Sequence, residues 1–319
     1  MDDRWKRRFE AMRRTIRAAI PASRPEVRLV APIVDADDRL DLAFVSFRDG
    51  NRSIWITAVD AGDRCARALL PGLGRTFDPA WSFDGSTLLF ISDVDGHDNV
   101  HSLDLGSGTV TRLTPNDADH RYPAMSPDGS SIVYLRARWR RPPQIWMMDA
   151  DGTNAREWHT GPGYKVRPTF RPDGEVITAQ LDRPRPAIHA FVVADGPNGP
   201  DTELSRNRDQ DTYPSWSPDG SRLVFAKTER ASIDAGITSK RIWSMDGDGS
   251  NPRPLATFAD ARHPIWSPDG EWVAFDAATP NGRQVHAVRP DGRDLRCVTS
   301  IGDNHTPAWR PGRGEPSIG

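Results

Sequence analysis

Apolar and polar residues alternate along this chain in short runs, which is the period of a half-buried β-strand and not that of a helix. The clearest runs each follow an Asp-Gly pair: Thr87–Ser92, Ser131–Leu135, Arg222–Ala226 and Glu271–Asp276. Further runs at 144–148 and 241–245 end in Asp-x-Asp-Gly, which is typical of a hairpin turn. The pattern therefore predicts an all-β fold.

The strands surround a repeated phrase, Pro-x-(aromatic or apolar)-(Ser or Arg)-Pro-Asp-Gly. Copies begin at Pro79, Pro123, Pro168, Pro214 and Pro264, and a truncated copy begins at Pro307. The copies are 43 to 50 residues apart. A period of about 40 to 50 residues with four short strands per unit is typical of a propeller blade. In the turn, Pro fixes one φ angle, Asp bonds the backbone beyond it, and Gly adopts the left-handed conformation.

The two chain ends are expected to complete the ring together. Residues 40–70 contain three strand-like runs without an innermost strand, and residues 305–310 contain an innermost strand without a blade. Joining them predicts a six-bladed β-propeller with four antiparallel strands per blade, formed by residues 25–319 as one domain.

A short basic amphipathic helix is expected to precede the propeller, within residues 1–24. Its apolar positions recur at helical spacing: Trp5, Phe9, Met12, Ile16 and Ile20. The segment has eight basic and three acidic residues. We expect it to dock on the propeller; contact with a membrane, nucleic acid or a partner is the alternative.

The repeated Pro-x-Trp-Ser-Pro-Asp-Gly, followed by Ile-Trp-x-Met-Asp-x-Asp-Gly, resembles the repeat of the TolB-type six-bladed β-propeller family. The resemblance covers roughly residues 38 to 311. It implies the fold far more strongly than a function, because related propellers occur in translocation proteins, peptidases, lyases and stand-alone proteins. This chain is expected to be a stand-alone propeller.

Composition excludes several classes of protein. The chain has 42 basic and 44 acidic residues, so no overall charge attracts it to nucleic acid. Cys65 and Cys297 are too few for a disulfide framework or a metal-binding pattern. No segment approaches the ~18 apolar residues of a membrane span, and no signal-peptide core is recognisable. We expect a cytoplasmic monomer without a cofactor, without stable membrane insertion and without a nucleic-acid partner.

The variable connections should all lie on one face of the propeller, opposite the short Asp-Gly turns, and loops on a rigid scaffold commonly carry function. Polar side chains just before each leading proline should ring the mouth of the axial channel on that face. The candidate ligand-binding residues there are Arg121, Tyr122, Lys165, Arg167, Asp211, Tyr213 and Arg262. A hydrated pore without a ligand is the alternative.

Three histidines, His120, His263 and His305, come from different repeats at similar offsets. Converging imidazoles would bind a divalent metal ion or act as acid and base, whereas separate ones would only form hydrogen bonds. A basic sector around Arg138 and Trp139 is a second candidate, because guanidinium groups bind carboxylate or phosphate and Trp stacks on rings. The same residues would otherwise form a solvated basic surface.

The sequence thus predicts a binding or scaffold propeller that recognises a protein or a small anionic ligand through its long-loop face. The alternative is a propeller enzyme, lyase-like or hydrolase-like and possibly metal-assisted. Its site would lie at the channel mouth, with the three histidines as catalytic candidates.

Overall fold

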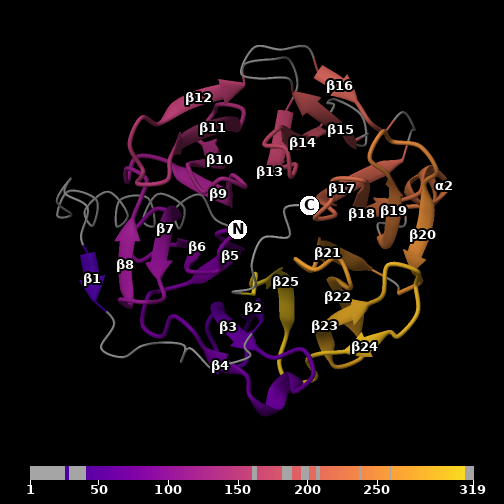
Figure 1. Ribbon diagram of the computed structural model, residues 1–319, viewed down its shortest axis with the longest axis horizontal. Helices are drawn as coiled ribbons and strands as arrows, with labels where there is room; N and C mark the ends of the chain where they lie inside the picture. Colours follow the sequence, from indigo (N-terminus) through magenta and orange to yellow (C-terminus); the bar gives the residue numbers. More distant parts are fainter. Residues whose placement is uncertain are drawn as a thin grey trace, which may run out of the picture.

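The structure, a computed structural model, describes residues 26–28, 41–159, 164–181, 189–194, 201–205, 209–236, 239–258 and 260–312. Viewed face-on, the strands surround a central hole (Figure 1). The sheets run outward from innermost strands that contact one another in a closed circle. These strands are β5 (Thr76–Trp81), β9 (Asp119–Met125), β13 (Tyr164–Phe170), β17 (Gln210–Trp216), β21 (Ala261–Trp266) and β25 (Asn304–Trp309).

The described strands form five hydrogen-bonded sheets. The first contains β5 (Thr76–Trp81), β6 (Thr87–Ser92), β7 (Asn99–Asp104), β8 (Thr109–Arg112) and β1 (Glu26–Arg28). The second contains β9 (Asp119–Met125), β10 (Ser131–Ala137), β11 (Gln144–Asp149) and β12 (Arg156–His159). The third contains β13 (Tyr164–Phe170), β14 (Val176–Leu181), β15 (His189–Ala194), β16 (Asp201–Glu203), β17 (Gln210–Trp216), β18 (Arg222–Thr228), β19 (Arg241–Asp246) and β20 (Arg253–Ala256).

The remaining two sheets complete the ring. One contains β21 (Ala261–Trp266), β22 (Val273–Thr279), β23 (Gly282–Val288) and β24 (Arg296–Cys297). The other contains β25 (Asn304–Trp309), β2 (Leu42–Ser46), β3 (Ser53–Thr57) and β4 (Arg67–Ala68). A strand from near the end of the chain thus pairs with strands from near its start, with Leu42 opposite Trp309.

The prediction of six four-stranded blades is wrong, because the structure has five blades and one of them has eight strands. A single parallel pair, His189 with Gln210, joins β15 to β17 and so merges two repeats into one sheet. The first sheet has five strands because β1 adds to its outer edge through β8. Alternation of apolar residues predicts where each strand lies, but it does not predict whether strands of neighbouring repeats pair with each other. The sequence pattern therefore could not predict that two repeats form one sheet.

The predicted helix before the propeller is not among the helices that the structure describes. No N-terminal helix is found in the described residues, where helical structure is limited to α2 (Arg230–Asp234) and the 3-10 turn η1 (Gly62–Arg64). The run from Trp5 to Ile20 on which the prediction depended lies outside the described residues. Among the described residues, no helix is both long and apolar enough to cross a membrane.

Four of the tight turns are each held by a serine and an aspartate acting together. Ser126 Oγ donates to Asp128 Oδ1 at 2.5 Å and accepts the Ser131 amide at 2.9 Å. The same arrangement recurs at Ser82, Ser217 and Ser267. The Ser-x-Asp-Gly sequence therefore specifies the hairpin between the innermost strand and the next one.

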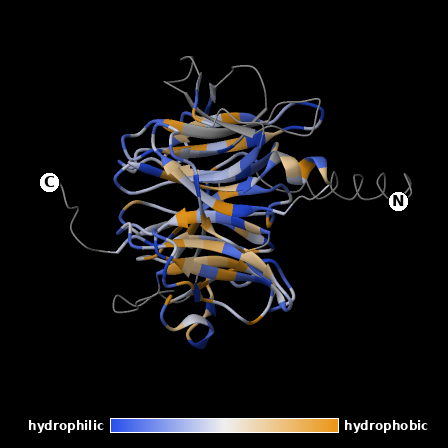
Figure 2. Ribbon diagram, turned by 90° about the vertical axis from the view of Figure 1, so that its right-hand side faces the viewer, coloured by the Kyte–Doolittle hydropathy of each residue, from blue (hydrophilic) through white to orange (hydrophobic). Residues whose placement is uncertain are grey.

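Large rings pack between the second and third strands of the repeats. They are paired residues in the strand register: Phe44 with Trp55, Phe90 with His101, Tyr134 with Trp146, Phe225 with Trp243, and Phe275 with His286. Opposed aromatic side chains of this kind stabilise a strand pair and fill the space between sheets. Seen from the side, hydrophobic colour runs along the strands and hydrophilic colour marks the loops of both faces (Figure 2).

Candidate functional site

The innermost strands have the same irregularity at each leading proline. The residue before the proline has a positive φ of 51° to 59°, and the register with the next strand shifts at that point. Two residues of the innermost strand then lie opposite one residue of its neighbour, which is a β-bulge, and a bulge re-aims side chains. The residues in this position are Asp78, Tyr122, Arg167, Tyr213, His263 and Thr306.

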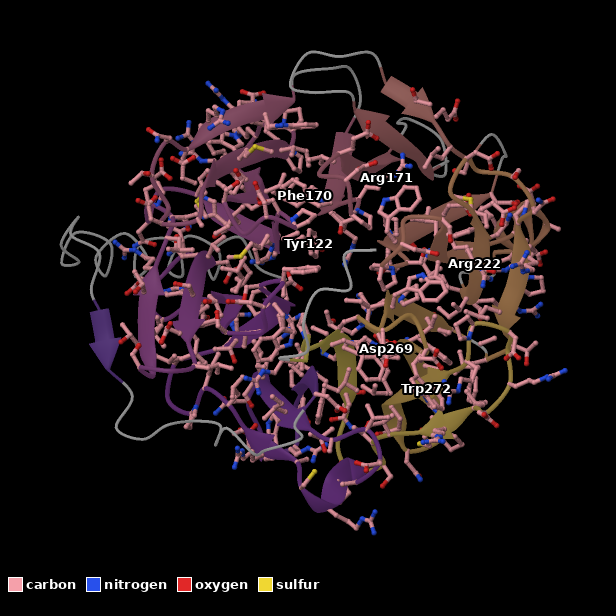
Figure 3. All side chains as sticks on the ribbon, viewed as in Figure 1. Tyr122, Phe170, Arg171, Arg222, Asp269 and Trp272 are labelled. Atoms are coloured by element: carbon pink, nitrogen blue, oxygen red, sulfur yellow. The ribbon has the colours of Figure 1, made fainter. Side chains whose placement is uncertain are left out.

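All these bulges lie near one face, which we call the mouth face. The starts of the innermost strands pair with the ends of the second strands, as Asp119 does with Ala137 and Thr76 with Ser92. The variable connections between the second and third strands therefore open on the same face. The opposite side, where the Ser-x-Asp-Gly turns lie, is the turn face. Figure 3 shows Tyr122 beside the central hole.

A cavity of about 350 Å³, here the axial cavity, opens on the mouth face. Its lining includes five arginines but only two carboxylates, Asp78 and Asp303. The arginines are Arg52, Arg121, Arg167, Arg262 and Arg283. The cavity is therefore cationic, although the chain as a whole is nearly neutral.

Arg167 lies between two tyrosines. Its Cζ atom is 4.0 Å from the ring centroids of both Tyr122 and Tyr213, and its Nη2 atom donates to the Tyr122 hydroxyl at 3.2 Å. Burial raises the pKa of Tyr122, so its ring keeps a neutral hydroxyl. The two aromatic faces cover the flat sides of the guanidinium and leave its N–H edge for a ligand.

Arg52 is the second arginine without a carboxylate partner. Its Cζ atom lies 4.1 Å from the Phe77 ring centroid, and its Nε atom is buried without a hydrogen bond. Burial lowers the pKa of Arg52, as expected of a cation that lacks an ion pair. In the part of the chain that the structure describes, neither Arg52 nor Arg167 forms an ion pair, whereas Arg121 pairs with Asp98.

The opposite wall is organised by a buried carboxylate, Asp276, which is fully shielded from solvent. It accepts hydrogen bonds from His263 Nδ1 at 2.6 Å, Arg283 Nε at 2.7 Å and the Thr306 amide at 3.0 Å. Burial raises the pKa of Asp276, but the opposing effect of His263 and Arg283 is larger, and the pKa falls to about 2. Arg283 also pairs with Asp260 at 2.7 Å, and Asp260 in turn holds Arg262.

The two walls meet through two tilted rings in contact. The ring centroids of Tyr213 and His263 are 4.2 Å apart, so contacts run from Asp276 through His263 and Tyr213 to Arg167. Burial lowers the pKa of His263, and it lowers that of His305 to about 4. Both imidazoles are therefore neutral near pH 7, which leaves the arginines as the cations of the site.

The sequence-predicted site residues divide between the cavity and other places. Arg121, Tyr122, Arg167, Arg262, His263 and His305 line the cavity, and Tyr213 contacts two of them. Asp211 is fully buried in β17. The side chain of Lys165 lies outside the described residues.

His120 is separated from the other two candidate histidines. It is buried 5.6 Å from Tyr134 by ring centroids, and burial lowers its pKa to about 4. No group of three or more His, Cys, Asp or Glu side chains that would hold a metal ion is found in the described ranges. The predicted basic sector lies on the connection after β10, where Arg138 pairs with Asp117 at 2.9 Å and Trp139 is 83% exposed.

Sequence reasoning missed Arg52, Phe77, Arg283 and Asp276. For the cavity it considered only polar residues just before each leading proline, which left out the apolar Phe77, whereas Arg52 and Arg283 begin or precede third strands. The strand register carries the missing signal, because the start of a third strand lies beside the end of the second and so on the mouth face.

A sequence profile described as the TolB beta propeller domain matches residues 21–232 and 160–314 of this chain. The Tol-Pal system protein TolB of Francisella tularensis is 26% identical over 249 residues, 73% of this chain and 54% of that protein. A protein TolB homolog of Chlorobium luteolum is 28% identical over 233 residues, 71% of this chain and 50% of that protein. The chain thus spans about half the length of these relatives.

Among solved structures, TolB from Acinetobacter baumannii superposes with a TM-score of 0.73 at 20% identity. The match covers 88% of this chain and 68% of that one. At that identity the likeness concerns the fold alone.

Proposed function

Since this chain belongs to the TolB beta propeller domain family, we propose that it is a binding module whose mouth face receives an acidic segment of a protein partner in the axial cavity. Curated relatives named as Tol-Pal system proteins support a partner that is itself a protein. The cytoplasmic location, the monomeric state and the absence of a cofactor stay predictions from the sequence.

One observation carries this proposal: exposed apolar side chains lie on the same face as the cationic cavity. Of the large exposed apolar residues described, four lie in connections on the mouth face, namely Phe47, Val94, Trp139 and Ile301. Phe47 also contacts the cavity residue His305, with ring centroids 5.6 Å apart. A face with exposed apolar side chains and a charged cavity suits a protein partner better than a free small anion, which needs no apolar contacts.

The unpaired arginines specify the chemistry of the inserted segment. Arg52 and Arg167 have N–H groups that no carboxylate of the described residues accepts from. A carboxylate of the bound protein would accept these hydrogen bonds. Both guanidinium groups are already held by aromatic rings, so little side-chain freedom would be lost on binding. A Glu-rich or Asp-rich segment with apolar neighbours is the expected occupant.

The test is fluorescence anisotropy with a labelled peptide that alternates Glu with Leu and Phe, compared with its Gln counterpart. Arg52→Gln and Arg167→Gln should each weaken binding about tenfold or more. The matched control is Arg171→Gln, because Arg171 also stacks on an aromatic ring, Trp216, but on the turn face. Equal binding of the Glu and Gln peptides, or equal effects of Arg167→Gln and Arg171→Gln, would refute the proposal.

An enzyme at the same cavity is the second candidate, favoured by the His263–Asp276 pair beside Arg167. A carboxylate that orients an imidazole is a common arrangement in general-base catalysis. His263→Gln distinguishes the two functions, because glutamine preserves hydrogen bonding but cannot transfer a proton. A binding module should retain peptide affinity in this variant. An enzyme should instead lose its ability to convert a co-purifying small carboxylate. Mass spectrometry would measure this conversion.

A further inference from the structure

A second hollow, here the interblade groove, lies on the turn face and has a volume of about 760 Å³. One wall comes from Arg222 and Arg253, at the starts of β18 and β20. The other comes from Gly270 and the turn after β23, including Arg289 and Asp294. Figure 3 shows Arg222 well away from the central hole, so the groove is separate from the axial cavity.

Arg222 is unusual for its place in the repeat. The residue two positions after each Asp-Gly pair is Thr87, Ser131, Val176 or Trp272 in the other copies. The backbone N–H of this residue bonds to the turn serine, as in Arg222, and makes no demand on the side chain. The fold alone therefore does not require a guanidinium here.

The guanidinium of Arg222 reaches across to the neighbouring blade. Its Nη2 atom donates to Ser244 Oγ at 3.2 Å and to the Pro290 carbonyl oxygen at 3.4 Å, so the group is fixed in position. Its Nε atom is buried and has no hydrogen-bond partner. A buried N–H without a partner is costly, which is further evidence that the fold alone does not require this arginine.

The groove is lined by four arginines and three carboxylates, Glu271, Asp291 and Asp294, but these carboxylates are not paired with Arg222 or Arg253. Among the described residues neither of them forms an ion pair, whereas Arg289 pairs with Glu271 and Arg293 contacts Asp291. Burial and the charge of Arg253 lower the pKa of Arg222, and the charges of Asp246 and Asp219 raise it by less. Two like charges thus act on each other, and neither has an ion-pair partner within the described ranges.

We propose that the interblade groove binds a multivalent oxyanion carried by a small molecule, a phosphate ester or a polycarboxylate, with Arg222 and Arg253 as its principal ligands. Bidentate arginine contacts suit both groups, and the two guanidinium groups together suit an anion with more than one negative charge. The groove is open to solvent, so the anion can carry an organic group that projects outward.

Isothermal titration calorimetry with inorganic pyrophosphate in one arm and citrate in the other tests this proposal. Arg253→Ala and Arg222→Gln should each weaken the tighter of the two ligands about tenfold or more. The arm that binds more tightly identifies the source of the oxyanion. Because Arg253 is exposed, its replacement should leave folding intact even if Arg222→Gln lowers stability.

Two variants serve as controls. Arg156→Ala removes an exposed arginine on another blade. Arg156 and Arg253 occupy the same position in their repeats, because each lies two residues after an Asn with positive φ. Arg167→Gln removes a cation of the axial cavity. Neither should change affinity. Absence of binding by both ligands would overturn the proposal, and so would binding that is unaffected by Arg253→Ala or is abolished by Arg167→Gln.

Discussion

Removing the charge of Asp276 should destabilise the propeller at the joint between the last two blades. Asp276→Asn leaves Arg283 and His263 without their buried carboxylate, which is fully shielded from solvent. The pKa of Asp276 is lowered from 3.8 to about 2, and this difference corresponds to about 2 kcal/mol of stability. Loss of one partner of a buried pair typically costs about 3–5 kcal/mol, so we expect a loss of about 2–4 kcal/mol at pH 7.

The assay is urea unfolding followed by tryptophan fluorescence at several pH values. A lowered pKa contributes stability that is present above the unfolded value, near 3.8, and is lost as the pH falls through about 2. The difference between wild type and variant should therefore shrink between pH 4 and pH 2. Asp294→Asn is the control, because Asp294 is exposed and its positive φ of 51° suits Asn equally well. A loss below about 1 kcal/mol at pH 7, or one that does not shrink in acid, would refute the reasoning.

Three further predictions concern stability and use the same unfolding assay. Ser126→Ala should cost about 1 kcal/mol by removing two hydrogen bonds of the turn, whereas Ser107→Ala, in an exposed turn, should cost less. Burial raises the pKa of Asp41 from 3.8 to about 6, so the stability that protonated Asp41 contributes is present below pH 3.8 and is lost as the pH rises through 6. Asp41→Asn should therefore stabilise the protein at pH 8 and not at pH 4. Gly249→Ala should cost about 2 kcal/mol or more, because φ is +88° and a Cβ would collide with the Leu204 carbonyl oxygen, whereas Gly236→Ala, with φ +75° in open space, should cost less.

The repeated turn phrase allowed most of the fold to be predicted. The run Thr87–Ser92 is β6 residue for residue, and the strand from Asn304 pairs with β2. These features depend on local sequence, that is, alternation and turn chemistry. The merged eight-stranded blade depends on one parallel pair, His189 with Gln210, between segments with no shared motif. A single long-range hydrogen-bonding contact leaves no periodic signal in the sequence.

The candidate site was only half predictable for a related reason. The phrase locates residues by their offset from proline, and it therefore found Tyr122, Arg167 and His263. Asp276 occupies an apolar-looking second strand, and its partners His263, Arg283 and Thr306 come from three strands. The convergence of such groups follows from the register between blades, which side-chain spacing along one strand does not encode.

The left-handed residues before the prolines show how function and stability compete at this site. A positive φ is tolerated best by Gly, Asn and Asp, yet Tyr122, Arg167, Tyr213 and His263 adopt it in the innermost strands. Because such a backbone costs about 1 kcal/mol or more for bulky residues, the presence of these four is better explained by the cavity that they line or contact than by the fold.

Thr306 is the best position at which to test whether these residues strain the backbone, because it is β-branched, has a φ of +54° and bears no charge. Its amide, which bonds Asp276, would remain in Thr306→Asn, and only the hydroxyl contact with His305 would be lost. We therefore expect this variant to unfold at a higher urea concentration, with a gain of about 0.5–1 kcal/mol. Thr109→Asn, in a strand without a positive φ, should instead destabilise, because Asn is disfavoured in strands. If both variants changed stability in the same direction, backbone strain at the bulges would not be the reason for these residues.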